Sequence, residues 1–230
     1  MSTATVDLHP ESRATPASTL AAPTVSETRR APFVFIGERL WLDFVNTDEI
    51  HRGQSHDAIH DFEALMWWLE ASTALDGERV AGIRRRAQQQ PAGAAAALVE
   101  ARRVRSSLRR LAERGAWDEA VRSETLAEIN RVLMRSAGTR RIEQRSDGSY
   151  ARTFVPGGDA FAGLMIPVVE SAADALIRAE LERVRRCADP RCQRVFLDAT
   201  RNGRRRWCDM AACGNRAKAA RHRERLAGRR

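Results

Sequence analysis

The stretch from Cys187 to Arg216 reads CADPRCQRVFLDATRNGRRRWCDMAACGNR and holds every cysteine of the chain. The cysteines form two pairs, each with four intervening residues, and fifteen residues separate Cys192 from Cys208. Structural zinc takes four ligands in a tetrahedron, and cysteine thiolates are common ligands. A hairpin between the pairs would bring them together. The spacing therefore predicts one structural Zn²⁺, bound by Cys187, Cys192, Cys208 and Cys213.

The residues between and after the pairs predict the local fold. Residues 195–197 are apolar and predict a strand, Asn202-Gly203 predicts a tight turn, and residues 204–207 predict the returning strand. Residues 209–226 predict a helix with Asp209 as its N-cap. The turn from Cys187 to Cys192, which we call the knuckle, forms with the hairpin and the helix the pattern of a small treble-clef-like zinc finger. About 45 residues cannot build a sufficient core alone, so the metal would supply the missing stability.

The four cysteines have two alternative interpretations besides a structural metal site. The cysteines could form two buried or disulfide-linked pairs, but the first 30 residues lack the pattern of a secretory signal. The longest apolar stretch, residues 160–177, is interrupted by Pro167, Glu170 and Asp174 and is too polar to span a bilayer. We therefore expect a cytoplasmic protein with reduced thiols and no membrane partner. Four thiolates leave no open position for water, which argues against a catalytic metal.

The positive charge of the chain is concentrated near its C-terminal end. The net charge is +9, yet residues 181–230 contain 16 Lys and Arg against 5 Asp and Glu, whereas residues 1–180 contain 23 against 25. Such asymmetry predicts a polyanionic partner. The alternative is a solubilising surface without a partner. Because the excess coincides with the cysteines, the sequence favours nucleic acid, DNA before RNA.

Candidate nucleic-acid contacts lie on the predicted returning strand and on the last helix. Its alanines lie between two basic rows, a shape that could enter a major groove and contact phosphates on both sides. Asn215 carries an amide that can pair with adenine. The alternative is a solvated helix in an arginine-rich protein. The candidates are Arg204, Arg205, Arg206, Asn215, Arg216, Lys218, Arg221, Arg223 and Arg225.

The rest of the chain predicts a mainly α domain with a small β component, in the α+β class. Residues 1–31, rich in Ser, Thr, Ala and Pro, predict a disordered leader. Apolar spacing and turn residues then predict the other elements. These are a strand at 33–36, helices at 40–45, 61–71, 76–89, 94–114, 119–136 and 158–178, the last kinked or restarted at Pro167, and a hairpin of 139–144 with 149–155. The predicted domains are 32–180 and 181–230.

Two motifs resemble a known family. Cys213-Gly214-Asn215-Arg216, preceded by the Arg-Arg-Trp-Cys of residues 205–208, resembles the CGNR zinc finger. The segment LDFVNT at 42–47 resembles the signature that opens the ABATE domain found with it. The likeness covers residues 33–226. It implies a bacterial, stress-induced transcription regulator that binds DNA through its zinc finger, and it brings no catalytic residues.

Three polar residues of LDFVNT, namely Asp43, Asn46 and Thr47, have two interpretations. They could contact a ligand in a sensor domain, or they could satisfy backbone groups at a helix end. A metal site formed by His51, His56 and His60 is a weaker alternative, given their spacing in a predicted loop.

The sequence predicts no enzyme, because it contains no glycine-rich phosphate loop and no recognisable nucleophile and base. The function it predicts is a transcription regulator whose N-terminal domain senses a small-molecule effector or forms a homodimer. The alternative functions are a zinc-dependent protein-interaction adaptor and an RNA-binding protein.

Overall fold

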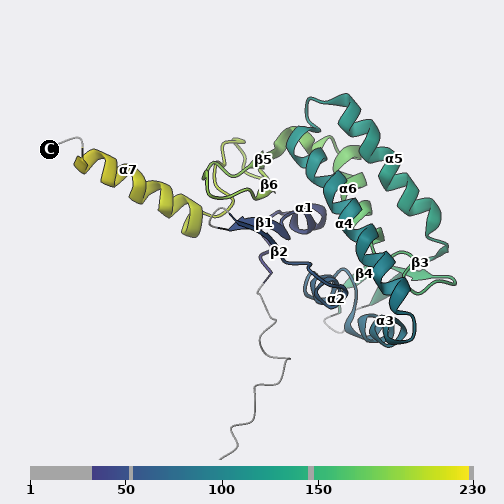
Figure 1. Ribbon diagram of the computed structural model, residues 1–230. Coiled ribbons are helices and arrows are strands. Elements are labelled where there is room, and N and C mark those ends of the chain that lie inside the picture. The colour runs from purple at the N-terminus through teal and green to yellow at the C-terminus, as the bar shows by residue number, and fades with distance from the viewer. Residues whose placement is uncertain (1–32, 52–53, 145–147, 228–230) are drawn as a thin grey trace, which may run out of the picture. The chain divides into compact units, whose positions relative to one another are not determined.

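The computed structural model describes residues 33–51, 54–144 and 148–227, so the predicted leader and the tip of the predicted hairpin lie outside the described residues. Most of the described chain is helical (Figure 1). The helices are α1 (Leu40–Val45), α2 (Phe62–Ala71), α3 (Gly77–Gln89), α4 (Pro91–Arg114), α5 (Glu119–Arg135), α6 (Ile166–Ile177) and α7 (Asn215–Ala227). The strands are β1 (Asp48–His51), β2 (Gln54–Asp57), β3 (Gly138–Gln144), β4 (Tyr150–Pro156), β5 (Val184–Arg186) and β6 (Val195–Leu197).

The helices begin at residues that satisfy free backbone N–H groups. Asp61 accepts from the amide of Ala64 at 2.7 Å, and Asp76 accepts from that of Arg79 at 2.8 Å. Pro167 stands in the first turn of α6, where a missing N–H costs nothing. Asp76 was expected to cap the helix that begins there, and it does so; α6 begins at Ile166, beside the expected restart at Pro167.

The short helix α1 lies in the main core. Trp41, Leu42, Phe44 and Val45 are all buried, and α1 contacts α4, α6 and β6. A helix of six residues is not stable by itself in water, so tertiary packing holds it. Around it, α4 and α5 run side by side (Figure 1). The sheets are three separate antiparallel hairpins, β1 with β2, β3 with β4 and β5 with β6.

The strands of the cysteine segment share this main core. Val184, Val195 and Leu197 pack in the same cluster as Trp41. The amide of Leu197 donates to the carbonyl of Gly37 at 3.0 Å. Contacts therefore cross the predicted boundary at residue 180, and residues 33–230 form one compact unit.

The side chain of Asn46 pairs with the edge of β6. Its Nδ2 donates to the carbonyl of Val195 at 2.8 Å, and its Oδ1 accepts from the amide of Val195 at 2.9 Å. Nearby, Nη1 of Arg109 in α4 donates to the carbonyl of Gln193 at 3.1 Å. These side chains satisfy backbone groups of the cysteine segment that neighbouring strands leave unpaired.

The local structure differs from the sequence predictions in several places. Residues 158–165, predicted as the first part of the helix 158–178, form a bend and turns, and α6 begins at Ile166. Residues 33–36 do not form a strand, and β1 with β2 form a hairpin that was not predicted. Residues 204–207 do not form a strand either, and β6 pairs with β5. One reason is that the amide of Arg205 donates to Asp198 Oδ2 at 2.9 Å and is not available for a ladder. The last helix is divided into a π-helical turn at Met210–Gly214 and α7.

Among the described helices, none combines the length and the apolar character needed to cross a membrane.

Replacing Asn46 by Ala is expected to lower the free energy of unfolding by about 2–6 kcal/mol. The substitution leaves the buried N–H and C=O of Val195 unpaired, at about 1–3 kcal/mol for each group. Urea denaturation of the full chain measures the change. The matched control is Asn130→Ala at an exposed position of α5, which should cost almost nothing. Equal stabilities of the two variants would contradict the role of Asn46.

Candidate metal centre and basic surface

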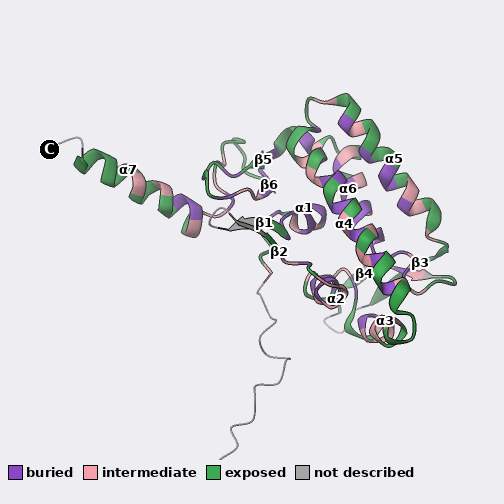
Figure 2. Cartoon of the chain, in the orientation of Figure 1, coloured by how far each residue is buried: buried purple, intermediate pink, exposed green. Residues whose placement is uncertain are grey.

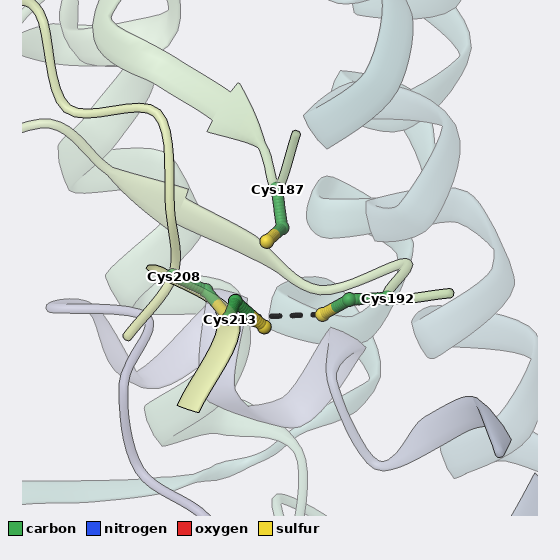
Figure 3. Close-up of side chains that lie close together, drawn as sticks. All are labelled: Cys187, Cys192, Cys208 and Cys213. Atoms are coloured by element: carbon green, nitrogen blue, oxygen red, sulfur yellow. Dashed lines mark hydrogen bonds between the residues drawn. The ribbon is translucent and has the colours of Figure 1, made fainter. Parts of the chain in front are cut away.

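The four cysteine sulfurs converge on one point (Figure 3). All four lie within 4.8 Å of one another, with 3.7 Å between the sulfurs of Cys192 and Cys208 and 3.6 Å between those of Cys208 and Cys213. Every cysteine is buried, and no disulfide joins them. The structure thus brings together residues that are up to 26 positions apart in the sequence, as the spacing predicted.

Hydrogen bonds and a helix cap position three of the cysteines, and the side chain of Arg205 donates to the carbonyl of Cys208. Cys187 follows β5, and its amide donates to the carbonyl of Arg194 at 2.9 Å. The amide of Cys192 donates to the carbonyl of Asp189 at 2.9 Å, which closes the knuckle. Cys213 lies in the π-helical turn that Asp209 caps. Oδ1 of Asp209 accepts from the amide of Ala211 at 2.7 Å. The predicted N-cap at Asp209 is confirmed.

Apolar side chains enclose the sulfurs. Phe196 is fully buried in a cluster with the four cysteines, and Ile36 and Trp207 pack against this cluster. Gly214 is buried as well, and a Cβ there would lie 2.8 Å from the sulfur of Met210. The metal centre is therefore shielded from water, as in structural zinc sites.

The donor set fits zinc. A tetrahedral ion with Zn–S bonds of about 2.3 Å separates its ligands by about 3.8 Å, close to the sulfur–sulfur distances found here. Burial raises the pKa of the Cys213 thiol, and the hydrogen bond with Cys192 together with burial raises that of Cys208. A bound divalent cation would favour loss of the thiol protons, because thiolates and not thiols are its ligands. Cys187, Cys192, Cys208 and Cys213 would hold one Zn²⁺, whose role is to cross-link the segment.

The basic candidates divide into two groups. Arg205, Arg216 and the amide residue Asn215 bind other groups of the cysteine segment, whereas Arg225 donates, among the described residues, only to the carbonyl of Arg221, at 3.4 Å. Arg205 donates to the carbonyls of Trp207 at 3.1 Å and of Cys208 at 2.5 Å, and its guanidinium lies 4.5 Å from the centre of the Phe196 ring. Arg216 donates to Cys213 Sγ and to Asp189, both at 2.8 Å. Nδ2 of Asn215 donates to the carbonyl of Ala211 at 3.0 Å.

The remaining candidates are exposed to solvent, as Asn215 and Arg216 also are. They lie in the segment before Trp207 and along α7, in which no residue is buried (Figure 2). The guanidinium of Arg206 lies 5.3 Å from the centre of the Trp207 ring. The remaining set is Arg204, Arg206, Lys218, Arg221, Arg223 and Arg225.

The polar residues of LDFVNT make internal hydrogen bonds. Oδ1 of Asp43 accepts from the amides of Ile36 and Gly37 at 2.9 and 2.7 Å, and burial raises its pKa. The hydroxyl of Thr47 donates to the carbonyl of Phe44 at 2.7 Å and accepts from Arg105 at 2.9 Å. A ligand at these residues would have to displace these bonds.

Sequence reasoning missed Asp189, which lies between the first two ligands. Its side chain is buried and accepts from Arg216 and from the amide of Arg191. An acidic residue between two closely spaced cysteines, with an arginine after the last cysteine, was the available signal.

Replacing Cys208 by Ser is expected to abolish zinc binding, since its sulfur lies beside two of the other three. Elemental analysis of the full chain should fall from about one zinc per chain to almost none. Loss of the metal removes on the order of 10 kcal/mol of binding free energy, so a chelator should lower the Tm of the wild type and leave the variant unchanged.

The matched control is Met210→Ser, which removes a neighbouring sulfur that is not a ligand. Its zinc content should equal that of the wild type. Full zinc content in Cys208→Ser would contradict the proposed ligand set.

Comparison with known families agrees with both motifs. The family model for the CGNR zinc finger matches residues 183–226, the range that contains the four cysteines. The ABATE model, described as "Putative stress-induced transcription regulator", matches residues 38–180, which is more than half of the chain. A search of the curated proteins finds no match. The chain therefore belongs to the ABATE family, and its CGNR zinc finger carries the four cysteines of one structural zinc site.

Proposed function

We propose that this protein is a transcription regulator that binds DNA through its zinc finger. The observation that carries the proposal is the exposure of α7, a helix of 13 residues without a buried residue, in which five side chains are Lys or Arg and one is acidic. The family description as a transcription regulator supports nucleic acid as the partner.

The composition of α7 favours a polyanionic partner. The helix has 13 residues, and isolated helices of that length are marginal in water. It has no apolar face to pack, and Arg221 and Arg225, four positions apart, repel each other. A row of phosphates would remove this repulsion and release counterions. Binding to DNA therefore accounts for a helix that intramolecular packing does not explain.

The exposed candidates form rows that suit phosphate contacts. Lys218, Arg221 and Arg225 are spaced at i, i+3 and i+7, which places them on one face of α7. Ala217 and Ala220 keep the helix narrow between this face and Arg223. We propose that these residues, with Arg204 and Arg206 on the preceding segment, contact phosphates on both sides of a groove.

Two rival partners follow from the same surface. An acidic protein would match its charge, and RNA would match its charge and phosphates. The binding experiment below compares both with duplex DNA. Duplex DNA is the partner proposed, because an α-helix fits the major groove of B-form DNA and not the deep, narrow one of RNA.

The proposed role of the N-terminal domain is to sense a small molecule or to form a homodimer. A hollow of about 550 Å³ between α4 and α5 has the size of small-molecule sites. Its arginines are paired with acidic neighbours, Arg103 with Glu128 at 3.0 Å and Arg110 with Glu124 at 3.4 Å. An effector bound there would have to replace these ion pairs.

The affinity for duplex DNA is expected to fall steeply with salt, because each phosphate contact adds about 0.9 to the slope of log K against log salt. The double variant Arg221→Ala/Arg225→Ala should reduce this slope by about two. Fluorescence anisotropy with the full chain and a labelled duplex, between low and physiological salt, measures both.

The matched control is Arg85→Ala/Arg86→Ala, which removes the same charge from an exposed face of α3. It should leave the slope unchanged. A flat salt dependence in the wild type would refute binding through phosphates. Equal effects of the two double variants would refute the proposal that α7 makes the phosphate contacts. Tighter binding to an RNA or to an acidic protein than to the duplex would favour the rivals.

A further inference from the structure

Arg216 is the last residue of the CGNR motif, and its side chain points back toward the metal centre. It lies in the first turn of α7, where its Nη2 donates to the sulfur of Cys213 at 2.8 Å. Its Nε donates to Oδ2 of Asp189, also at 2.8 Å. One guanidinium thus connects a cysteine of the second pair with a carboxylate in the knuckle of the first pair.

Asp189 holds this guanidinium in place. Its side chain is only 3% exposed and accepts a second hydrogen bond, from the amide of Arg191 at 3.1 Å. Its Oδ2 accepts from Nε of Arg216 and its Oδ1 from the backbone of Arg191, so the carboxylate is held between a guanidinium and an amide and forms an ion pair with Arg216.

The metal centre needs a positive neighbour. A zinc ion with four thiolates carries a net charge of −2, and these sulfurs are buried, where a net charge is costly. A hydrogen bond from a guanidinium to one of the thiolates lowers this cost. Such outer contacts commonly tune a metal site and orient its ligands.

The neighbouring arginines have other partners. Arg205 donates to the carbonyls of Trp207 and Cys208, and it pairs with Glu38 at 3.0 Å. Arg191 lies 3.6 Å from Asp189, and two thirds of its side chain is exposed. Arg216, in contrast, donates a hydrogen bond to a cysteine sulfur.

We propose that Arg216 is a positioning residue of the metal centre and not a phosphate contact. It offsets the charge of the Cys213 thiolate, which strengthens zinc binding, and it ties the first turn of α7 to the knuckle through Asp189. Zinc occupancy and the direction of the basic helix are thereby linked. This inference rests on the zinc site and is independent of the proposal that the protein binds DNA.

Competition for zinc between the full chain and a chromophoric chelator tests the inference. Arg216→Ala should bind zinc about 10–100-fold more weakly than the wild type, the usual effect of removing a partner of a metal ligand. Arg216→Lys should fall between the two, because an ammonium group keeps the charge but does not offer the two-pronged fork. Asp189→Asn should weaken zinc binding in the same direction.

The matched control is Arg221→Ala, which removes the same charge from the same helix at an exposed position. Its zinc affinity should equal that of the wild type. Circular dichroism checks that each variant is folded, and if Arg216→Ala is not, Arg216→Lys decides. Wild-type zinc affinity in folded Arg216→Ala would overturn the inference.

A second measurement separates the metal from the nucleic acid. With zinc saturating, Arg216→Ala should keep the salt slope of DNA binding, whereas Arg221→Ala should lose about 0.9. An equal loss in both variants, with unchanged zinc affinity in Arg216→Ala, would make Arg216 a phosphate contact. If the wild type does not bind DNA, the proposed function fails, and the zinc competition still decides the role of Arg216.

Discussion

The mutual proximity of four buried sulfurs is the constraint on which the C-terminal segment depends. Thiolates held within 4.8 Å of one another repel, and burial removes the water that would screen them. A cation at their centre makes the thiolate arrangement favourable, and Zn²⁺ matches both the ligand type and the spacing. Residues 204–209 have little regular structure, and α7 has no buried residue. Without the metal, few contacts would hold these residues to β6.

The zinc finger is also attached to the N-terminal domain through polar groups. Asn46 pairs with the backbone of Val195, and Arg109 reaches the carbonyl of Gln193. Both side chains come from elements of the N-terminal domain, α1 and α4, and both are directional contacts that tolerate little displacement. They fix the cysteine segment to the helices that pack around α1.

The arginines of the segment have different environments although they are chemically identical. Arg205 and Arg216 bind carbonyls, a carboxylate and a sulfur, although the side chain of Arg216 is still 44% exposed, whereas Lys218, Arg221 and Arg225 lie along the exposed α7. The first group offsets charge in a buried site, where electrostatic interactions are strong. The second group has no acidic partner among the contacts described here and remains available for an external polyanion.

The sequence alone determined the metal ligands, because four cysteines in two close pairs have few other uses in a chain of this kind. It also determined most helices, since apolar spacing and the aspartates at 61, 76 and 118 mark their faces and their starts. Tertiary structure alone decided which strand pairs with β6. Two segments beside cysteines, 204–207 and 184–186, could each have paired with β6. The bond from the amide of Arg205 to Asp198 and the place of Val184 in the shared core decide for 184–186, which is β5. It likewise decided the roles of Asn46 and Arg216, because a side chain's partner depends on residues 149 and 27 positions away, which local sequence patterns do not encode.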